Sequence, residues 1–311
     1  MRPAASPADA GAAAAETVLR LAVLLQAGVA PAAAWGHLSD TGDPAAARIA
    51  AASHDGMPLP DAIAAAGPAP GRPARRSGAA AEGPERVWAD VAAAWRVATG
   101  VGAPLAETLR AVASALRDAQ EAADDVRVAL AEPAGTARLM GWLPLVAVGL
   151  GAALGFDTFG VLFAQPFGIA CLVAGAALIL AAQRWNAALV RRARAEGGVP
   201  GIGAELLAIA LSGGVSIERA TAIVSAAGAP ADASTDLVLS LSRTAGVPAV
   251  ELLRASAALS RHRARIEGRL RAARLSSRLL LPLGVCTLPA FLLLGVAPMM
   301  LSVMSTMPLS F

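Results

Sequence analysis

The side chains of this chain that could take part in chemistry are few and widely separated. Its three histidines, His37, His54 and His262, have no partners at metal-ligand spacing, and its two cysteines lie inside apolar runs, as small core residues do. All 26 basic residues are arginines. Without a lysine the chain cannot supply the lysine of a P-loop, a protein kinase or a Schiff base. The sequence therefore predicts no metal and no cofactor, and a chain without lysine is not expected to hydrolyse NTP itself.

Charged residues do recur in one pattern, G-x-P-x-x-E-x-L-R, which occurs twice. Residues 102–111 read GAPLAETLRA and residues 246–255 read GVPAVELLRA, with six of ten positions identical. The recurring turn and charged residues are Gly102, Pro104, Glu107 and Arg110 in the first copy and Gly246, Pro248, Glu251 and Arg254 in the second. Glycine marks a turn between helices, proline suits a helix start, and glutamate complements the positive end of the helix dipole. Each copy therefore predicts a turn followed by a helix.

The glutamate and arginine of each copy are three residues apart, which places them on one face of a helix. Two hypotheses explain why they recur: they fix the packing of neighbouring helices, or they form a surface that a partner protein contacts. The adjacent acids Asp124 and Asp125 face different sides of a helix, and we interpret them as solvated surface and not as an acid–base pair.

The densest charge lies between residues 261 and 278, which hold seven arginines and one acid. The arginines are Arg261, Arg263, Arg265, Arg269, Arg271, Arg274 and Arg278. Two interpretations are open: a helix beside the membrane that contacts anionic lipid head groups, and a docking surface for an acidic partner. The stretch has no aromatic residue that could stack on a base, so no nucleic-acid partner is expected.

The composition favours a membrane protein, since 56% of residues are hydrophobic, 16% are charged, and the mean hydropathy is +0.58. Three uncharged runs are long enough to span a bilayer: Leu139–Phe156, Val161–Gln183 and Leu279–Met304. Arginines precede the first and third runs and follow the second. This asymmetry predicts a cytoplasmic N-terminus and an extracytoplasmic C-terminus.

A second pair of similar windows indicates an internal duplication. Residues 21–29 read LAVLLQAGV and residues 207–215 read LAIALSGGV, with five of nine positions identical. The predicted fold is an all-α membrane protein with two duplicated cytoplasmic helical-bundle modules and three transmembrane helices. Its parts are a disordered tail (1–15), module 1 (16–137, with a flexible insertion at 67–84), a transmembrane hairpin (138–183), a linker (184–204), module 2 (205–277), a third transmembrane helix (278–305) and an extracytoplasmic tail (306–311). A signal peptide over Leu21–Ala34 is disfavoured because the acids Asp9 and Glu16 precede it.

This order of modules and spans, with the motif ahead of charged helices, resembles the type II secretion system F family. That family comprises inner-membrane platform proteins of secretion and pilus machines, and the short, Ala-rich modules are most similar to its tight-adherence (Tad) pilus branch, TadB/TadC-like. The resemblance covers residues 16–305 and includes Leu109 and Leu253 of the two motif copies.

The resemblance implies a non-enzymatic plasma-membrane platform that couples a cytoplasmic secretion ATPase to pilin extraction and filament assembly. The implied partners are the secretion ATPase, pilin subunits, a paralogous platform protein or a second copy of the chain, and the lipid bilayer. The alternative is a permease subunit of a transporter, although a permease would need a more polar path through its spans. A neighbouring gene for a secretion ATPase and a pilin, or for a nucleotide-binding transporter subunit, would separate the two.

Overall fold

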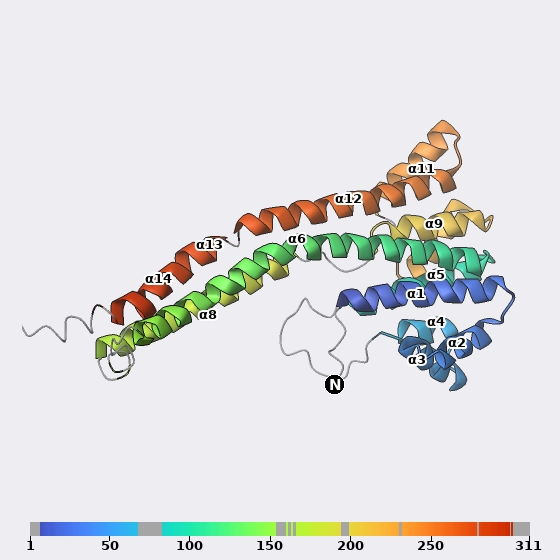
Figure 1. The fold of residues 1–311 in the computed structure, drawn as a ribbon. Coiled ribbons are helices and arrows are strands. Elements are labelled where there is room, and N and C mark those ends of the chain that lie inside the picture. Colours follow the sequence, from blue (N-terminus) through green and yellow to red (C-terminus); the bar gives the residue numbers. More distant parts are fainter. Residues whose placement is uncertain are drawn as a thin grey trace, which may run out of the picture. The chain divides into compact units, whose positions relative to one another are not determined.

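The computed structural model describes residues 7–67, 83–153, 160, 163, 166–193, 199–229, 232–278, 280–298 and 300. The regular elements in these ranges are all helical (Figure 1). The predicted all-α class is therefore confirmed for the described part of the chain. The helices divide into two compact units, each made of two stretches of sequence: residues 1–124 with 196–267, and residues 125–195 with 268–311.

The described residues of unit 1 form eight whole helices and the beginnings of two long ones. They are α1 (Pro7–Gln26), α2 (Pro31–Asp40), α3 (Pro44–His54), α4 (Leu59–Ala64), α5 (Gly83–Val101), α9 (Ile202–Ser212), α10 (Ile217–Ala226) and α11 (Ala233–Ala245), with the N-terminal parts of α6 (Leu105–Ala153) and α12 (Ala249–Arg278). Helix α5 packs against α1 and α4 and also against α9 and α10. It therefore joins helices from both halves of the sequence.

Side chains from both predicted modules belong to one hydrophobic core within unit 1, and the duplication of the modules stays a prediction. Fully buried side chains from the first half, such as Trp35 and Leu109, belong to the same buried cluster as Leu207 and Leu253 from the second. The reason lies in α9, of which residues 204–210 are all buried. Apart from Glu205, these residues are apolar or alanine, and α5 and α10 pack against the helix.

Short turns with glycine at positive φ connect the helices of unit 1. Gly28 (φ +88°) follows α1, and Gly214 (φ +82°) follows α9 at the corresponding place in the second half. Polar side chains cap the starts of α3, α10 and α11; at α3, Asp43 accepts hydrogen bonds from the backbone of Ala45 and Ala46 at 2.8 and 3.0 Å. These caps satisfy N–H groups that have no partner within the helix.

Unit 2 contains α8 (Pro166–Ala193), the remainders of α6 and α12, and the short elements α13 (Leu280–Pro282), η1 (Leu283–Thr287), α14 (Leu288–Phe291) and η2 (Leu292–Val296). The elements η1, α14 and η2 pack along α8. Both η1 and η2 are π-helical, and η1 immediately precedes the turn that contains Pro289. A proline there has no N–H to donate to the carbonyl four residues earlier, so the regular α-helical pattern is interrupted.

Among the described residues, one helix is long and apolar enough to cross a membrane. It runs from Pro166 to Leu189 and overlaps the second predicted span. The first predicted span ends at Phe156, and the third begins at Leu279 and ends at Met304, positions that lie outside the described residues. Three spans therefore remain a prediction.

Two predicted boundaries differ from the structure. The expected disordered tail ends at residue 15, but α1 begins at Pro7, and Ala14 and Ala15 are buried in the core. A run of alanines there favours helix, and its small side chains pack closely. The expected linker begins at residue 184, but α8 continues to Ala193. Most of the predicted insertion, residues 68–82, lies outside the described residues.

Candidate functional site

The two motif copies form the turns that precede the long helices α6 and α12. Gly102 (φ +72°) follows α5, and Gly246 (φ +67°) ends α11. Glycine adopts this left-handed conformation without the steric cost that a Cβ brings. In each copy the proline, Pro104 or Pro248, stands one position before the first residue of the long helix. Both copies thus have the turn followed by a helix that the pattern predicts.

The charged residues of the motif lie towards solvent. The Arg254 Nη1 and Glu251 Oε1 atoms are 3.5 Å apart, and the two side chains are 50% and 73% exposed. Glu107 is exposed, and within the described part of the chain neither it nor Arg110 forms an ion pair or hydrogen bond through its side chain. The described contacts therefore contain no bond from these four side chains to a neighbouring helix.

Acids of α6 form ion pairs with arginines of α12. In unit 1, Arg261 Nε lies 3.0 Å from Asp118 Oδ2, and Arg265 Nη1 lies 3.4 Å from Glu121 Oε2. Residue numbers rise together along the two helices, so α6 and α12 run parallel there. We call these contacts, together with the one that follows in unit 2, the ion-pair ladder.

The third ion pair of the ladder lies in unit 2. Arg269 Nη2 lies 3.0 Å from Asp125 Oδ2, and Gly268 lies against Val126, where an added Cβ would be 3.1 Å from the valine side chain. The Arg265 and Arg269 pairs each join residues 144 apart, which is also the separation of the two motif glycines. The paired residues thus occupy equivalent positions of the predicted repeat, an acid in one half and an arginine in the other.

Arg261 also contacts a third helix. Its Nη1 atom lies 3.5 Å from Oε2 of Glu205 on α9, whose side chain is 9% exposed, while the Arg261 side chain is 16% exposed. Glu205 is therefore a buried carboxylate, and a buried charge is tolerated when a counter-ion accompanies it. Arg261 supplies that counter-ion and links α6, α9 and α12.

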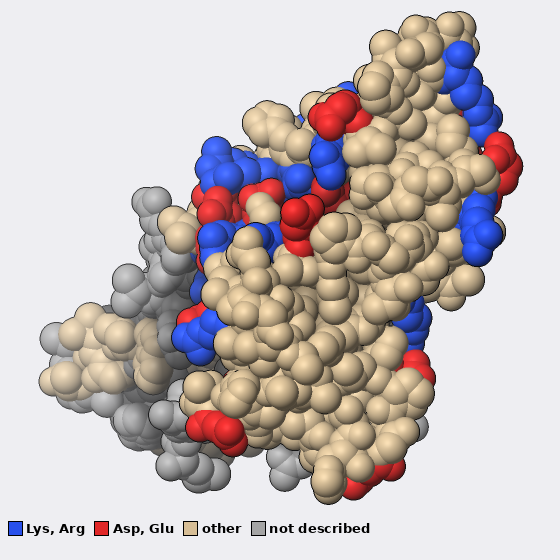
Figure 2. Space-filling model, turned by 90° about the vertical axis from the view of Figure 1, so that its right-hand side faces the viewer, with Lys and Arg blue, Asp and Glu red and all other residues tan. Residues whose placement is uncertain are grey.

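The remaining arginines of the 261–278 stretch face outward or have other partners. Arg263, Arg271 and Arg278 are exposed, and Arg274 makes a further interaction. At least three of the seven arginines thus neutralise acids of their own chain. Figure 2 shows basic and acidic side chains intermixed at one side of the face in view, and much of the rest of the described surface on that face carries neither.

Helix α6 carries the charged residues of the first motif copy in its first turns and the acids of the ladder further along. Residues 17–152 match the family model for the type II secretion system (T2SS), protein F. We call this stretch the T2SSF segment; it reaches from α1 almost to the end of α6 and contains the first motif copy. The match covers less than half of the chain and supports the predicted type II secretion F family. The searches of curated proteins and of solved structures gave no match.

Sequence reasoning missed the acidic half of the ladder, all of which lies in the T2SSF segment. Asp118, Glu121 and Asp125 are spaced three and four residues apart, the spacing of one helix face, and the paired arginines follow at intervals of four. Aligning the two halves at the 144-residue separation of the motif glycines would have placed Glu121 opposite Arg265 and Asp125 opposite Arg269. The two adjacent acids have different partners: Asp125, which is 26% exposed, pairs with Arg269, and Asp124 accepts a hydrogen bond from Gln120 at 3.1 Å. Among the described residues, no group of three metal-ligating side chains is assembled.

Asp90 on α5 is a further acid of the T2SSF segment that sequence reasoning missed. Burial raises the pKa of its carboxyl group from 3.8 to about 6, although a hydrogen bond from the Val199 backbone and the charge of Arg86 act in the opposite direction. Its Oδ2 atom is buried without a hydrogen-bond partner among the described residues. The hydrogen bond from Val199 attaches Asp90 of α5 to the segment that leads into α9. Ionisation of this buried carboxyl group lowers the stability of the folded state.

Replacing Asp90 with asparagine should stabilise the protein at pH 8. The folded state binds the Asp90 proton more tightly than the unfolded state, so the stability that this proton contributes is present below about pH 4 and is lost as pH rises through 6. An asparagine keeps the acceptor for Val199 and never ionises, which gives a gain of about 1–3 kcal/mol at pH 8 and less at pH 5. Thermal unfolding at both pH values checks this; a gain independent of pH would contradict it.

Proposed function

We propose that the chain is a non-enzymatic inner-membrane platform of a type II secretion or Tad-type pilus machine, which couples a cytoplasmic secretion ATPase to pilin extraction and filament assembly. The observation that carries the proposal is the T2SSF match over residues 17–152. The apolar helix between Pro166 and Leu189 supports a place in the membrane. The Tad branch is proposed on the short, Ala-rich modules alone.

The long helices supply a physical route for coupling. Helix α6 has 49 residues and α12 has 30, and each contributes residues to both units. A hydrogen-bonded helix resists stretching and bending, so a displacement at one end is passed along it. In this proposal the ATPase acts on unit 1, and the ion-paired helices carry the displacement to unit 2, where pilins are lifted.

The proposed partners are the secretion ATPase, pilin subunits, and a paralogous platform protein or a second copy of the chain, all at the plasma membrane. Exposed charges at the motif turns, Glu107 and Glu251 in particular, offer surface to a cytoplasmic partner. The exposed Arg263, Arg271 and Arg278 are suited to anionic lipid head groups. The chain itself contributes binding and movement, while ATP hydrolysis belongs to the partner.

We predict a multi-pass topology with the N-terminus in the cytoplasm and the C-terminus outside. Reporter fusions at Asp157 and after Phe311 should report an extracytoplasmic position, and a fusion at Ala204 a cytoplasmic one. The physical reason is the placement of arginines on one side of the three apolar runs. A cytoplasmic signal from the C-terminal fusion would contradict the topology.

Charge reversal at Glu107 and Arg110 separates the two hypotheses for the motif. Because the described structure gives these side chains no bond to another helix, we expect the double variant Glu107→Arg/Arg110→Glu to accumulate normally. We expect it to lose co-purification of the secretion ATPase at least about tenfold, equivalent to about 1.4 kcal/mol, and to assemble no filaments.

Charge reversal of Glu218 and Arg243, an exposed pair between α10 and α11, provides the control for protein quantity. Reduced accumulation of the motif variant would favour the packing hypothesis instead. Normal accumulation with normal ATPase binding and filaments would reject both hypotheses and leave shared ancestry as the explanation of the motif.

A further inference from the structure

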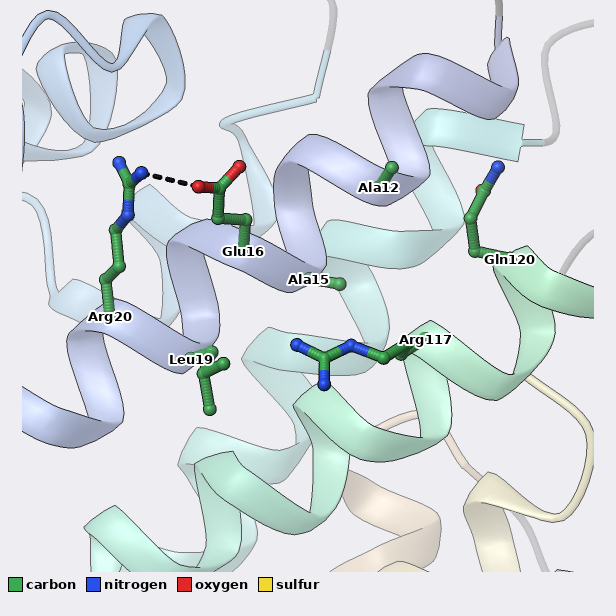
Figure 3. A pocket seen from close by; sticks show the side chains of 7 residues that line it. All are labelled: Ala12, Ala15, Glu16, Leu19, Arg20, Arg117 and Gln120. Carbon is green, nitrogen blue, oxygen red and sulfur yellow. Dashed lines mark hydrogen bonds and ion pairs between the residues drawn. The ribbon is translucent and has the colours of Figure 1, made fainter.

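A groove of about 450 Å³ lies in unit 1 between α1 and α6 (Figure 3). Its lining residues are Ala12, Ala15, Glu16, Leu19 and Arg20 from α1 and Arg117 and Gln120 from α6. Figure 3 shows the Arg117 guanidinium reaching from α6 towards α1, while Glu16 and Arg20 pair with each other. The alanines leave space beside the guanidinium, so the groove is open to an additional side chain.

Arg117 is a cation without a counter-ion in the groove. Within the described part of the chain, its side chain forms no ion pair and no hydrogen bond. The one acid that lines the groove, Glu16, is already paired with Arg20 at 2.5 Å. The free charge of Arg117 is therefore available to a carboxylate from outside the described structure.

The second half of the chain shows what this position binds. At the motif offset of 144 residues, Arg117 corresponds to Arg261. Arg261 contacts two carboxylates, Asp118 on α6 and Glu205 on α9. An arginine at this place in the repeat thus receives carboxylates from two neighbouring helices.

The positions equivalent to these two carboxylates are not acidic near Arg117. The position equivalent to Asp118 at the same offset is His262, which is exposed. The windows at 21–29 and 207–215 align Glu205 with Leu19, and Leu19 lines the groove. Arg117 therefore lacks equivalents of the two acids that pair with Arg261.

We propose that the groove between α1 and α6 binds a carboxylate side chain of a partner protein, which takes the place at Arg117 that Glu205 takes at Arg261. The apolar rim formed by Ala12, Ala15 and Leu19 suits an acidic residue flanked by small apolar neighbours. This inference rests on the proposed function for the identity of the partner, the secretion ATPase. The carboxylate site itself is tested without that partner.

The first test is a double-mutant cycle on the full-length chain in detergent. Leu19→Glu builds the missing acid into the groove, with Leu19→Gln as the uncharged control of similar shape. In the presence of Arg117 we expect Leu19→Glu to melt about 2–4 °C above Leu19→Gln, and we expect this advantage to vanish in an Arg117→Ala background. Equal melting temperatures of the two Leu19 variants beside Arg117 would overturn the site.

The second test measures binding of the purified secretion ATPase of the same machine. Leu19→Glu places a carboxylate of the chain itself beside Arg117, and Arg117→Glu reverses the charge of the groove. Each variant should therefore weaken binding of the ATPase at least about tenfold. Arg219→Glu, at an exposed arginine of α10, is the control and should bind as the unmodified chain does. Unchanged binding of the two groove variants would overturn the inference and leave the proposed function standing. An ATPase that does not bind the unmodified chain would overturn both the proposed function and this partner.

Discussion

Replacing Gly201 with alanine should lower the melting temperature of the protein by about 5–15 °C. Gly201 has φ +77° and precedes α9, and an added Cβ would lie 2.8 Å from the Ala257 carbonyl oxygen and 2.9 Å from its Cα atom. Both contacts are to the backbone of α12, which cannot turn aside as a side chain can. Overpacking of this kind and the left-handed conformation together cost about 2–4 kcal/mol.

Gly214→Ala is the matched control for this prediction. Gly214 has nearly the same φ, +82°, but an added Cβ would meet nothing within 4 Å. We expect only the conformational cost of about 1 kcal/mol, a loss of about 2–4 °C. Tryptophan fluorescence follows the melting, since Trp35, Trp88 and Trp95 are buried in unit 1. Equal losses from the two variants would show that the approach of α12 to Gly201 is not tight.

Replacing Arg261 with alanine should have a comparably large effect, a loss of about 2–4 kcal/mol in the free energy of unfolding. The variant removes the cation from Glu205, and breaking a buried ion pair on one side leaves the remaining charge without compensation. The double variant Arg261→Ala/Glu205→Leu should recover a large part of the loss because no buried charge is left. Chemical denaturation in detergent measures both.

Arg254→Ala provides the comparison for an exposed pair. Arg254 pairs with Glu251 where both side chains are at least half exposed, and such a pair contributes about 0–1 kcal/mol. If Arg261→Ala costs no more than Arg254→Ala, Glu205 is solvated and the link between α6, α9 and α12 contributes nothing to stability. If the double variant is no more stable than Arg261→Ala, the loss comes from packing and not from charge.

The sequence carried enough information to predict the helical class and the turns at Gly102 and Gly246. Local signals decide these features, because a glycine, a proline and an acid in order specify where a helix begins. The sharing of one core by both halves was not predictable from such signals. It depends on α9 packing against α5, a contact between residues about a hundred positions apart in the chain, which the hydrophobic pattern of either helix leaves open.

The candidate site was predictable only in part. The arginines between 261 and 278 stood out as a dense run of one charge, which suggested lipid or an outside partner. Their pairing with Asp118, Glu121 and Asp125 depends on two helices lying parallel, and composition does not encode that arrangement. Asp90 escaped notice because its raised pKa results from burial, which is a property of the folded chain.

The central claim, that the chain is the membrane platform of a filament-assembling secretion machine, is tested most directly by deleting its gene and imaging surface filaments by electron microscopy. The account predicts that the deletion strain assembles no filaments although its pilin and secretion ATPase accumulate to normal levels, and that the unmodified gene restores assembly. A deletion strain that assembles filaments in normal number would contradict the account.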